Sequence, residues 1–281
     1  MLKYEIVKKE VGVGMPKFRI YWTFTKKAFL RSAVYRFDVW SRLSANLIFL
    51  LMWGSIWTAL YAGREEAGGV SFGSMITYIV VSQFLTGANG AGTPLWEIQE
   101  KVRSGDIALE LMRPFDVPLR YLFADIGSVA FYIMTALVPI YTILFIFMDL
   151  TLPTNWLTWV CFIFAGLIGF LIRYCIEMSF GLLSFFLVET GGIQDIFYFA
   201  ISLLSGSVIP LWFFPDWLAK IAIYLPFQGI YYIPNAIFIG EIAGIDILFS
   251  MGLQLFWVFV CYLILRLIWN RASHKVVVQG G

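Results

Sequence analysis

Six long runs of uncharged, mostly apolar residues constrain the fold of this chain more than any other feature. Each run approaches or exceeds the roughly 20 residues that a helix needs to cross a ~30 Å hydrocarbon core. Only 14% of the residues are charged, against about 25% in a soluble domain. The sequence therefore predicts an all-α membrane protein with six transmembrane helices. The runs are Leu43–Gly63, Ala67–Trp96, Ile126–Met148, Leu150–Ile172, Ile196–Pro215 and Ile247–Leu265.

A seventh uncharged run, Ile221–Gly240, differs from the others because helix-breaking and polar residues interrupt it. Such residues are tolerated at membrane depth only where protein or water satisfies the freed backbone groups. We therefore expect residues 214–245 to form an extracellular re-entrant helical hairpin before the last span. The interrupting residues are Pro226, Gln228, Gly229, Pro234 and Asn235.

The distribution of lysine and arginine predicts the orientation in the membrane. The segment Met1–Arg42 has ten basic residues against three acidic ones, and further basic residues follow the second run and the last run. The opposite side keeps only Arg64 and Lys220. Because basic residues concentrate on the cytoplasmic side, both termini are expected there. An even number of spans is then required, which favours six over seven.

Residues 17–39 predict an amphipathic helix on the cytoplasmic membrane surface. Its basic residues suit anionic lipid headgroups, although Lys26 and Arg36 fall near the apolar side and would have to extend toward water. The apolar side is formed by Phe18, Trp22, Phe29, Ala33 and Phe37, with Lys27 and Arg31 opposite.

A charged segment, residues 93–114, separates the second and third runs and predicts two short amphipathic helices. Thr93–Pro94 is typical of a helix start, and Arg113–Pro114 of a helix end. The pattern leaves two interpretations open, helices lying in the lipid headgroups or a docking surface for a cytoplasmic partner. The first apolar face has Leu95, Ile98 and Val102; the second has Ile107, Ala108, Leu111 and Met112, with Asp106 and Glu110 opposite.

Arg173 and Glu177 are charged residues inside or next to the fourth run. Their spacing of four places them on one helix face, where they can pair. An isolated charge in the bilayer is unfavourable, so we expect a paired arrangement near the inner boundary. It can act as a structural tie or as part of a polar pathway. Asp125 and Asp195 are expected at the membrane surface.

Three glycines and two prolines punctuate the spans. Gly87, Gly90 and Gly92 favour either close helix packing or a flexible end of the second span. Pro139 and Pro210 predict kinks in their helices.

Several kinds of chemistry are excluded by the residues of this chain. No Gly-Lys pair occurs, so the chain lacks the G-x-x-x-x-G-K-[ST] nucleotide loop. His274 is the single histidine and lies in the tail, which excludes histidine metal sites and Ser/His catalysis within the membrane. We therefore expect no catalytic residue, no metal, no cofactor and no nucleic-acid partner for this chain.

The sequence resembles the permease subunits of ABC type 2 exporters. The likeness rests on GDIALELMRP within residues 93–114, on GSVIPLWFFPDWL (206–218) and on LPFQGIYYIPNAIFIG (225–240), together with the basic N-terminal segment. It implies a single transmembrane domain over residues 1–281, with a connecting helix at 17–39, a coupling helix at 93–114 and the hairpin at 214–245. By position, the residues implied to contact an ATPase are Glu97, Val102, Ser104, Gly105, Asp106, Leu109 and Met112.

The resemblance implies a complex of two permeases, identical or homologous, with two copies of a separate ATPase subunit that binds ATP and Mg. The expected function is export of a drug-like, peptide or lipid-like cargo across the bacterial cytoplasmic membrane, in contact with membrane lipid. Two alternatives remain open, an ion-coupled secondary transporter and a non-transporting membrane enzyme or assembly factor.

Overall fold

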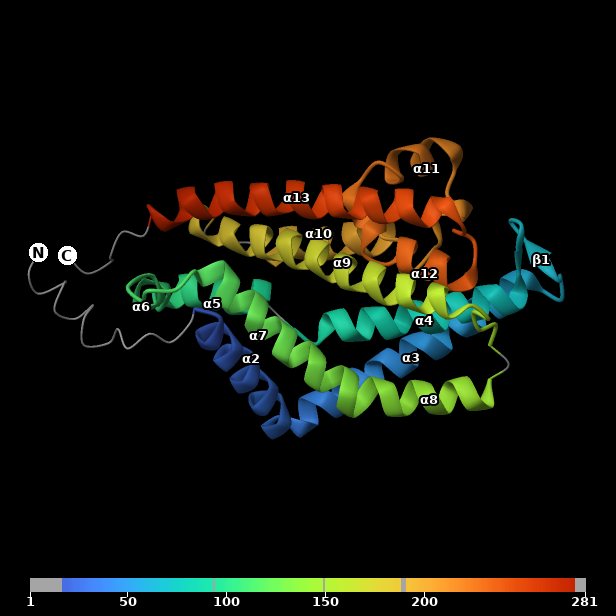
Figure 1. Cartoon of the computed structure of the whole chain (residues 1–281), viewed down its shortest axis with the longest axis horizontal. Helices are drawn as coiled ribbons and strands as arrows, with labels where there is room; N and C mark the ends of the chain where they lie inside the picture. Colours follow the sequence, from blue (N-terminus) through green and yellow to red (C-terminus); the bar gives the residue numbers. More distant parts are fainter. Residues whose placement is uncertain (1–16, 93, 149, 188–190, 276–281) are drawn as a thin grey trace, which may run out of the picture.

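The structure is an elongated bundle of helices that run side by side along one axis (Figure 1). It is a computed structural model that describes residues 17–92, 94–148, 150–187 and 191–275. The first elements are α2 (Lys17–Val34), α3 (Arg36–Tyr61), β1 (Glu66–Ala67), β2 (Val70–Ser71), α4 (Phe72–Gly90), α5 (Pro94–Ser104), α6 (Ile107–Leu111), α7 (Val117–Tyr132), the π-helix η1 (Ile133–Leu137) and α8 (Val138–Phe147). They are followed by α9 (Trp156–Gly181), the 3₁₀-helix η2 (Leu182–Phe185), α10 (Gly191–Leu204), η3 (Leu211–Phe213), α11 (Asp216–Ala222), η4 (Pro226–Gly229), α12 (Tyr232–Ile239) and α13 (Ile245–Ser273).

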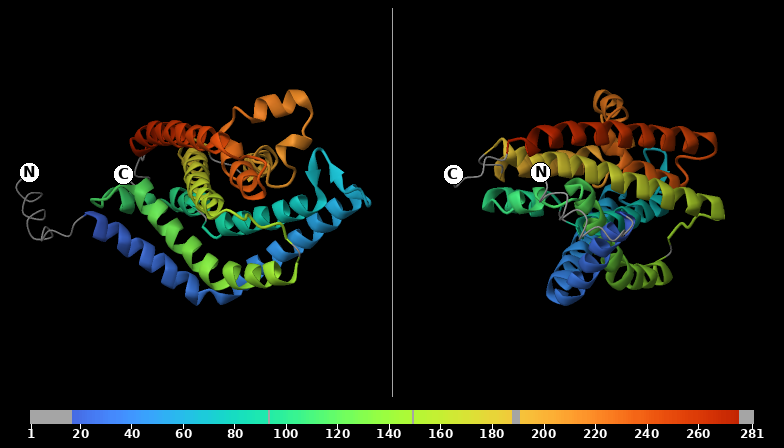
Figure 2. Two further views of the ribbon diagram at one scale, coloured as in Figure 1. Left: turned by 45° about the vertical axis from the view of Figure 1, so that its right-hand side comes forward. Right: turned by 60° about the vertical axis from the view of Figure 1, so that its left-hand side comes forward.

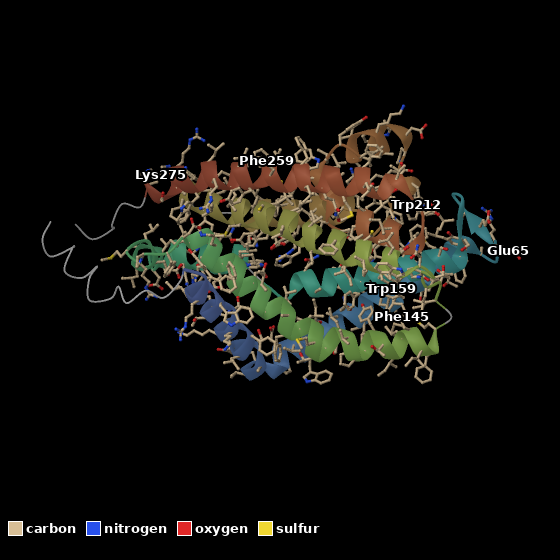
Figure 3. All side chains as sticks on the ribbon, in the orientation of Figure 1. Glu65, Phe145, Trp159, Trp212, Phe259 and Lys275 are labelled. Carbon is tan, nitrogen blue, oxygen red and sulfur yellow. The ribbon has the colours of Figure 1, made fainter. Side chains whose placement is uncertain are left out.

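The two ends of the bundle carry different elements (Figure 1). Helix α2 begins and α13 ends at the end that also holds α5 and α6, which we call the α6 end. The short antiparallel hairpin β1–β2, helices α11 and α12 and the start of α9 lie at the other end, which we call the hairpin end. Figure 3 shows Lys275 at the α6 end and Glu65 at the hairpin end.

Four helical stretches of the described chain are long and apolar enough to cross a membrane: Phe37–Tyr61, Val117–Phe147, Trp156–Phe185 and Ile245–Ser273. They confirm an all-α membrane protein and match four of the six predicted spans. The second predicted span is α4, which has 19 residues but more polar ones. The fifth is α10, whose 14 residues extend only about 21 Å at 1.5 Å per residue. The count of six spans therefore stays a prediction.

Helix α4 lies inside the bundle, and its polar side chains are buried among neighbouring segments. Eleven of its residues are buried, and their polar groups bond to neighbouring segments. The Tyr78 hydroxyl donates to the Gly206 carbonyl at 2.6 Å, and Ser82 Oγ donates to the Ser207 carbonyl at 2.8 Å. Protein partners replace the water that these groups would lose in hydrocarbon, so a central helix needs less hydropathy than a lipid-facing one.

Two bends lie next to each other near the α6 end. The predicted helix 17–39 is interrupted at Tyr35, which separates α2 from α3. In the neighbouring helical segment, the π-helix η1 joins α7 to α8 immediately before Pro139. Proline lacks the N–H of a regular helix and clashes with the carbonyl four residues earlier, so the kink predicted at Pro139 is confirmed. Pro210 instead follows the end of α10, in an irregular segment.

Helix α2 packs along α7 over most of its length, as the views of Figure 2 show. Thr25 Oγ1 donates to the Phe123 carbonyl at 2.8 Å, and the rings of Phe29 and Phe131 meet edge to face at 5.1 Å. A side chain at Gly127 would overlap the Thr25 carbonyl. The predicted apolar face is thereby divided, because Phe29 packs on α7 whereas Phe18 and Phe37 remain exposed.

Residues 214–245 contain the short helices α11, η4 and α12. Six of the eight residues of α12 are buried, and α12 packs against α9 and α4. A Cβ atom at Gly169 would lie 2.6 Å from the Gly229 carbonyl oxygen, so the segment between α11 and α12 reaches the middle of α9. This depth supports the predicted re-entrant hairpin, whose position relative to a membrane stays a prediction.

Gln254 of α13 fixes this deep segment to the bundle. Its buried Nε2 donates to the Gly229 carbonyl at 2.7 Å and to the Ala165 carbonyl at 3.0 Å. Replacing Gln254 with leucine keeps the side-chain volume but removes both bonds, so we expect a loss of about 1–3 kcal/mol in stability. The midpoint of thermal unfolding in detergent measures it, with Ser250→Ala on α13 as control. An unchanged midpoint for Gln254→Leu would contradict the assignment.

Candidate functional site

Helix α5 is seated on the bundle through a buried apolar face. Leu95 and Ile98 are fully buried, and Val102 packs against the same core cluster. Gly181, at the end of α9, permits this close approach because a Cβ there would lie 2.5 Å from Ile98 Cγ2. The predicted apolar face of α5 is therefore confirmed, and it packs against α9. Thr93, the predicted helix start, lies outside the described residues.

Helix α6 departs from the prediction at two residues. Ile107 is buried and Asp106 is exposed as expected, with Ala108 and Leu111 half-buried. Glu110 is buried instead of exposed, and Met112 of the predicted apolar face is 83% exposed, as Leu109 is to 60%. The reason is electrostatic, because Glu110 points inward to reach Lys101 and Arg120. The result is an exposed apolar surface at the tip of the α6 end (Figure 1).

An ion-pair network joins α5 and α6 to their neighbours. Arg120 of α7 lies 3.0 Å from Glu110 and 3.5 Å from Glu97, and Lys101 pairs with both carboxylates. Arg31 of α2 approaches Glu97 at 3.8 Å. Glu97, a predicted ATPase contact, is thus held by its own chain, and Val102 lies half-buried in the core. Glu97 and Val102 therefore lie on the inner side of this region and stabilise the exposed residues of α6.

A tight turn connects the two helices and exposes Ser104, Gly105 and Asp106. Gly105 has a φ of +82°, a conformation that side chains disfavour. Ser104 Oγ donates to Asp106 Oδ2 at 3.0 Å. We define the coupling tip as these three residues together with Leu109 and Met112, which is the part of the predicted contact set that is exposed.

Asp116 anchors the segment that follows α6. Its carboxylate accepts from the Leu119 N–H at 2.9 Å, which caps α7, and from Arg266 of α13 at 2.5 Å. Its own N–H donates to the Tyr21 hydroxyl of α2 at 3.1 Å. Asp116 therefore links the segment that follows α6 to α2, α7 and α13.

Arg173 lies between two carboxylates in the interior. Its guanidinium is 2.6 Å from Glu177 Oε2 and 2.5 Å from Asp125 Oδ2, and its side chain is only 2% exposed. The predicted pairing with Glu177 is confirmed. Asp125, expected at the membrane surface, is buried within the protein because the guanidinium of Arg173 pairs with this second carboxylate from α7. Asp195 is exposed, and the depth of both residues in a membrane stays a prediction.

Gly92 connects this ion cluster to α5. A side chain at Gly92 would overlap the carboxylate of Asp125, and a Cβ at Gly87 would lie 3.1 Å from Asn46 Nδ2, a tight contact. Gly90 has open space around it. Close packing therefore explains two of the three glycines. Pro94 begins α5 two residues after Gly92, so Asp125 packs close to the start of α5.

The deep segment of residues 226–231 approaches the same cluster from the hairpin end. Tyr231, which ends this segment, is buried. Among the described residues, no group of three or more His, Cys, Asp or Glu could hold a metal ion.

The class of protein follows from these observations: a multi-pass α-helical membrane protein with an exposed turn and exposed apolar side chains at one end. A family model described as "ABC-2 family transporter protein" matches residues 45–280. The chain therefore belongs to the ABC-2 transporter family and is an ABC-2 type permease. A comparison with curated proteins found no match.

Proposed function

We propose that this chain is the permease subunit of an ATP-driven exporter and that the coupling tip docks into a separate ATPase subunit. The exposure of Leu109 and Met112 carries this proposal. Two large apolar side chains at an aqueous end of a membrane protein favour a protein partner, and the ion pairs beneath them provide a rigid support.

The remaining parts of the proposal follow from the family. Two permeases, identical or homologous, and two ATPases would form the complex, with ATP and Mg bound by the ATPase. The chain would lie in the bacterial cytoplasmic membrane with the α6 end and both termini in the cytoplasm. The cargo would be a drug-like, peptide or lipid-like molecule moved outward.

The state of the interior charges favours this function over ion-coupled transport. A secondary transporter needs ionisable groups at midplane that can bind and release an ion. Arg173 is already paired with both Asp125 and Glu177, at distances of 2.5 and 2.6 Å. The cluster is better suited to hold α7 and α9 together than to exchange ions.

Co-purification of the tagged chain in mild detergent, followed by mass spectrometry, tests the proposal. A P-loop ATPase at one copy per permease is the expected result. The stoichiometry and the number of distinct permeases follow from the same measurement. Reproducible absence of an ATPase from a folded, monodisperse preparation would refute the proposal.

A further inference from the structure

A cavity of about 430 Å³ lies between the α2–α3 bend, α7 and the junction of α4 with α5. We call it the bend chamber. It contains no residue of the coupling tip, although Glu97 of the ion-pair network lines it. Its α7 wall carries polar side chains at intervals of three to four residues, which places them on one face of the helix: Tyr121, Asp125, Ser128 and Tyr132.

Three of these side chains present polar atoms without a protein partner. The Tyr121 and Tyr132 hydroxyls and Asp125 Oδ1 are buried and make no hydrogen bond. Buried polar groups are normally satisfied. The carboxylate oxygen of Asp125 can only accept a hydrogen bond, whereas the two hydroxyls can accept or donate one. The chamber therefore calls for a ligand that supplies N–H or O–H groups.

The charges of the chamber are balanced. Arg42 pairs with Asp38 at 2.9 Å and Arg31 approaches Glu97 at 3.8 Å, and Asp125 shares Arg173 with Glu177. Such a lining suits a ligand that carries both signs. Arginine is the preferred partner of phosphate, whereas the aromatic hydroxyls and rings favour an ammonium group.

The chamber lies at the depth of lipid headgroups. Counting about 20 residues from the hairpin end brings α3 to Arg42 and α13 to Arg266. An adjoining apolar groove of about 150 Å³ shares Val39 and Phe131 with the chamber. The groove continues past Trp40 to Ala136, farther along the spans, where an acyl chain would lie.

We propose that the bend chamber binds the headgroup of a zwitterionic phospholipid with a primary ammonium, phosphatidylethanolamine, from the inner leaflet. The phosphate meets Arg31 and Arg42, and the ammonium donates to the free acceptors on α7. One acyl chain follows the apolar groove. Choline lacks N–H donors and phosphatidylglycerol lacks the cation, so both bind more weakly.

Lipid titration of the delipidated full-length protein, with its co-purifying subunits, tests this inference. Native mass spectrometry counts the bound molecules of dioleoyl-phosphatidylethanolamine. The phosphatidylcholine and phosphatidylglycerol with the same two acyl chains serve as comparisons. Arg31 is 57% exposed, so Arg31→Gln leaves the fold intact. Lys27→Gln, on the exposed side of the same helix and outside the chamber, is the matched control.

We expect phosphatidylethanolamine to bind about ten-fold more tightly than phosphatidylcholine or phosphatidylglycerol, because one additional charge-assisted hydrogen bond increases affinity by about this factor. Arg31→Gln should remove this preference, Lys27→Gln should keep it, and Ser128→Leu should block the chamber. Equal binding of the three lipids, a preference for phosphatidylglycerol, or no effect of Arg31→Gln would overturn the proposal. Displacement by soluble phosphoethanolamine at equal concentration would overturn the assignment to a lipid.

Discussion

Lysine at both Leu109 and Met112 is expected to abolish binding of the ATPase subunit while the chain still folds and inserts. Both side chains are exposed at the coupling tip, so their replacement disturbs no internal packing. Apolar anchors at the centre of an interface each contribute about 2 kcal/mol or more, and a lysine there would be buried without a partner. The pair should weaken binding by about 3 kcal/mol or more, which exceeds 100-fold.

The measurement is recovery of the ATPase with tagged permease, together with the ATP hydrolysis rate of the purified complex. The control is Ile221→Lys with Ile223→Lys, two exposed apolar residues at the hairpin end, which should retain the ATPase. A further variant, Asp106→Lys with Leu109→Lys, keeps Met112 and should reduce hydrolysis coupled to transport. Normal recovery of ATPase with the Leu109 and Met112 variant would place the docking surface elsewhere.

Replacing Arg173 with methionine is expected to be the most destabilising single change in the interior. It leaves Asp125 and Glu177 buried without their cation, and the loss of one partner from a buried ion pair typically costs about 3–5 kcal/mol. Replacing all three charged residues together, with alanine at Asp125 and methionine at Arg173 and Glu177, should recover most of that loss. No uncompensated charge then remains in the interior.

The fraction of monodisperse protein after heating, followed by size-exclusion chromatography, measures this order of stability. Arg103→Met removes the same charge from an exposed position on α5 and should leave the midpoint unchanged. The idea of a coupled cluster fails if the triple variant is less stable than Arg173→Met, since independent sites give additive losses. Gly92→Ala should also lower the midpoint, because its side chain overlaps Asp125.

The sequence by itself determined the class of the protein, because hydropathy and charge act locally. Uncharged runs of about 20 residues have few stable forms other than membrane helices, and this predicted α3, α9 and α13. The apolar face of α5 followed from residue spacing alone, and so did the pairing of Arg173 with Glu177 one turn apart. The kink before Pro139 needed only the chemistry of proline.

Only the tertiary structure decided which charges are buried and which apolar residues are exposed. Asp125 and Arg173 are 48 residues apart, and no helical period relates them. Glu110 turns inward because it pairs there with Arg120 and Lys101. In this orientation of the helix, Leu109 and Met112 are exposed. The bend chamber likewise forms where α2, α3, α5 and α7 meet. Such features depend on which helices become neighbours, which the pattern within any one helix does not specify.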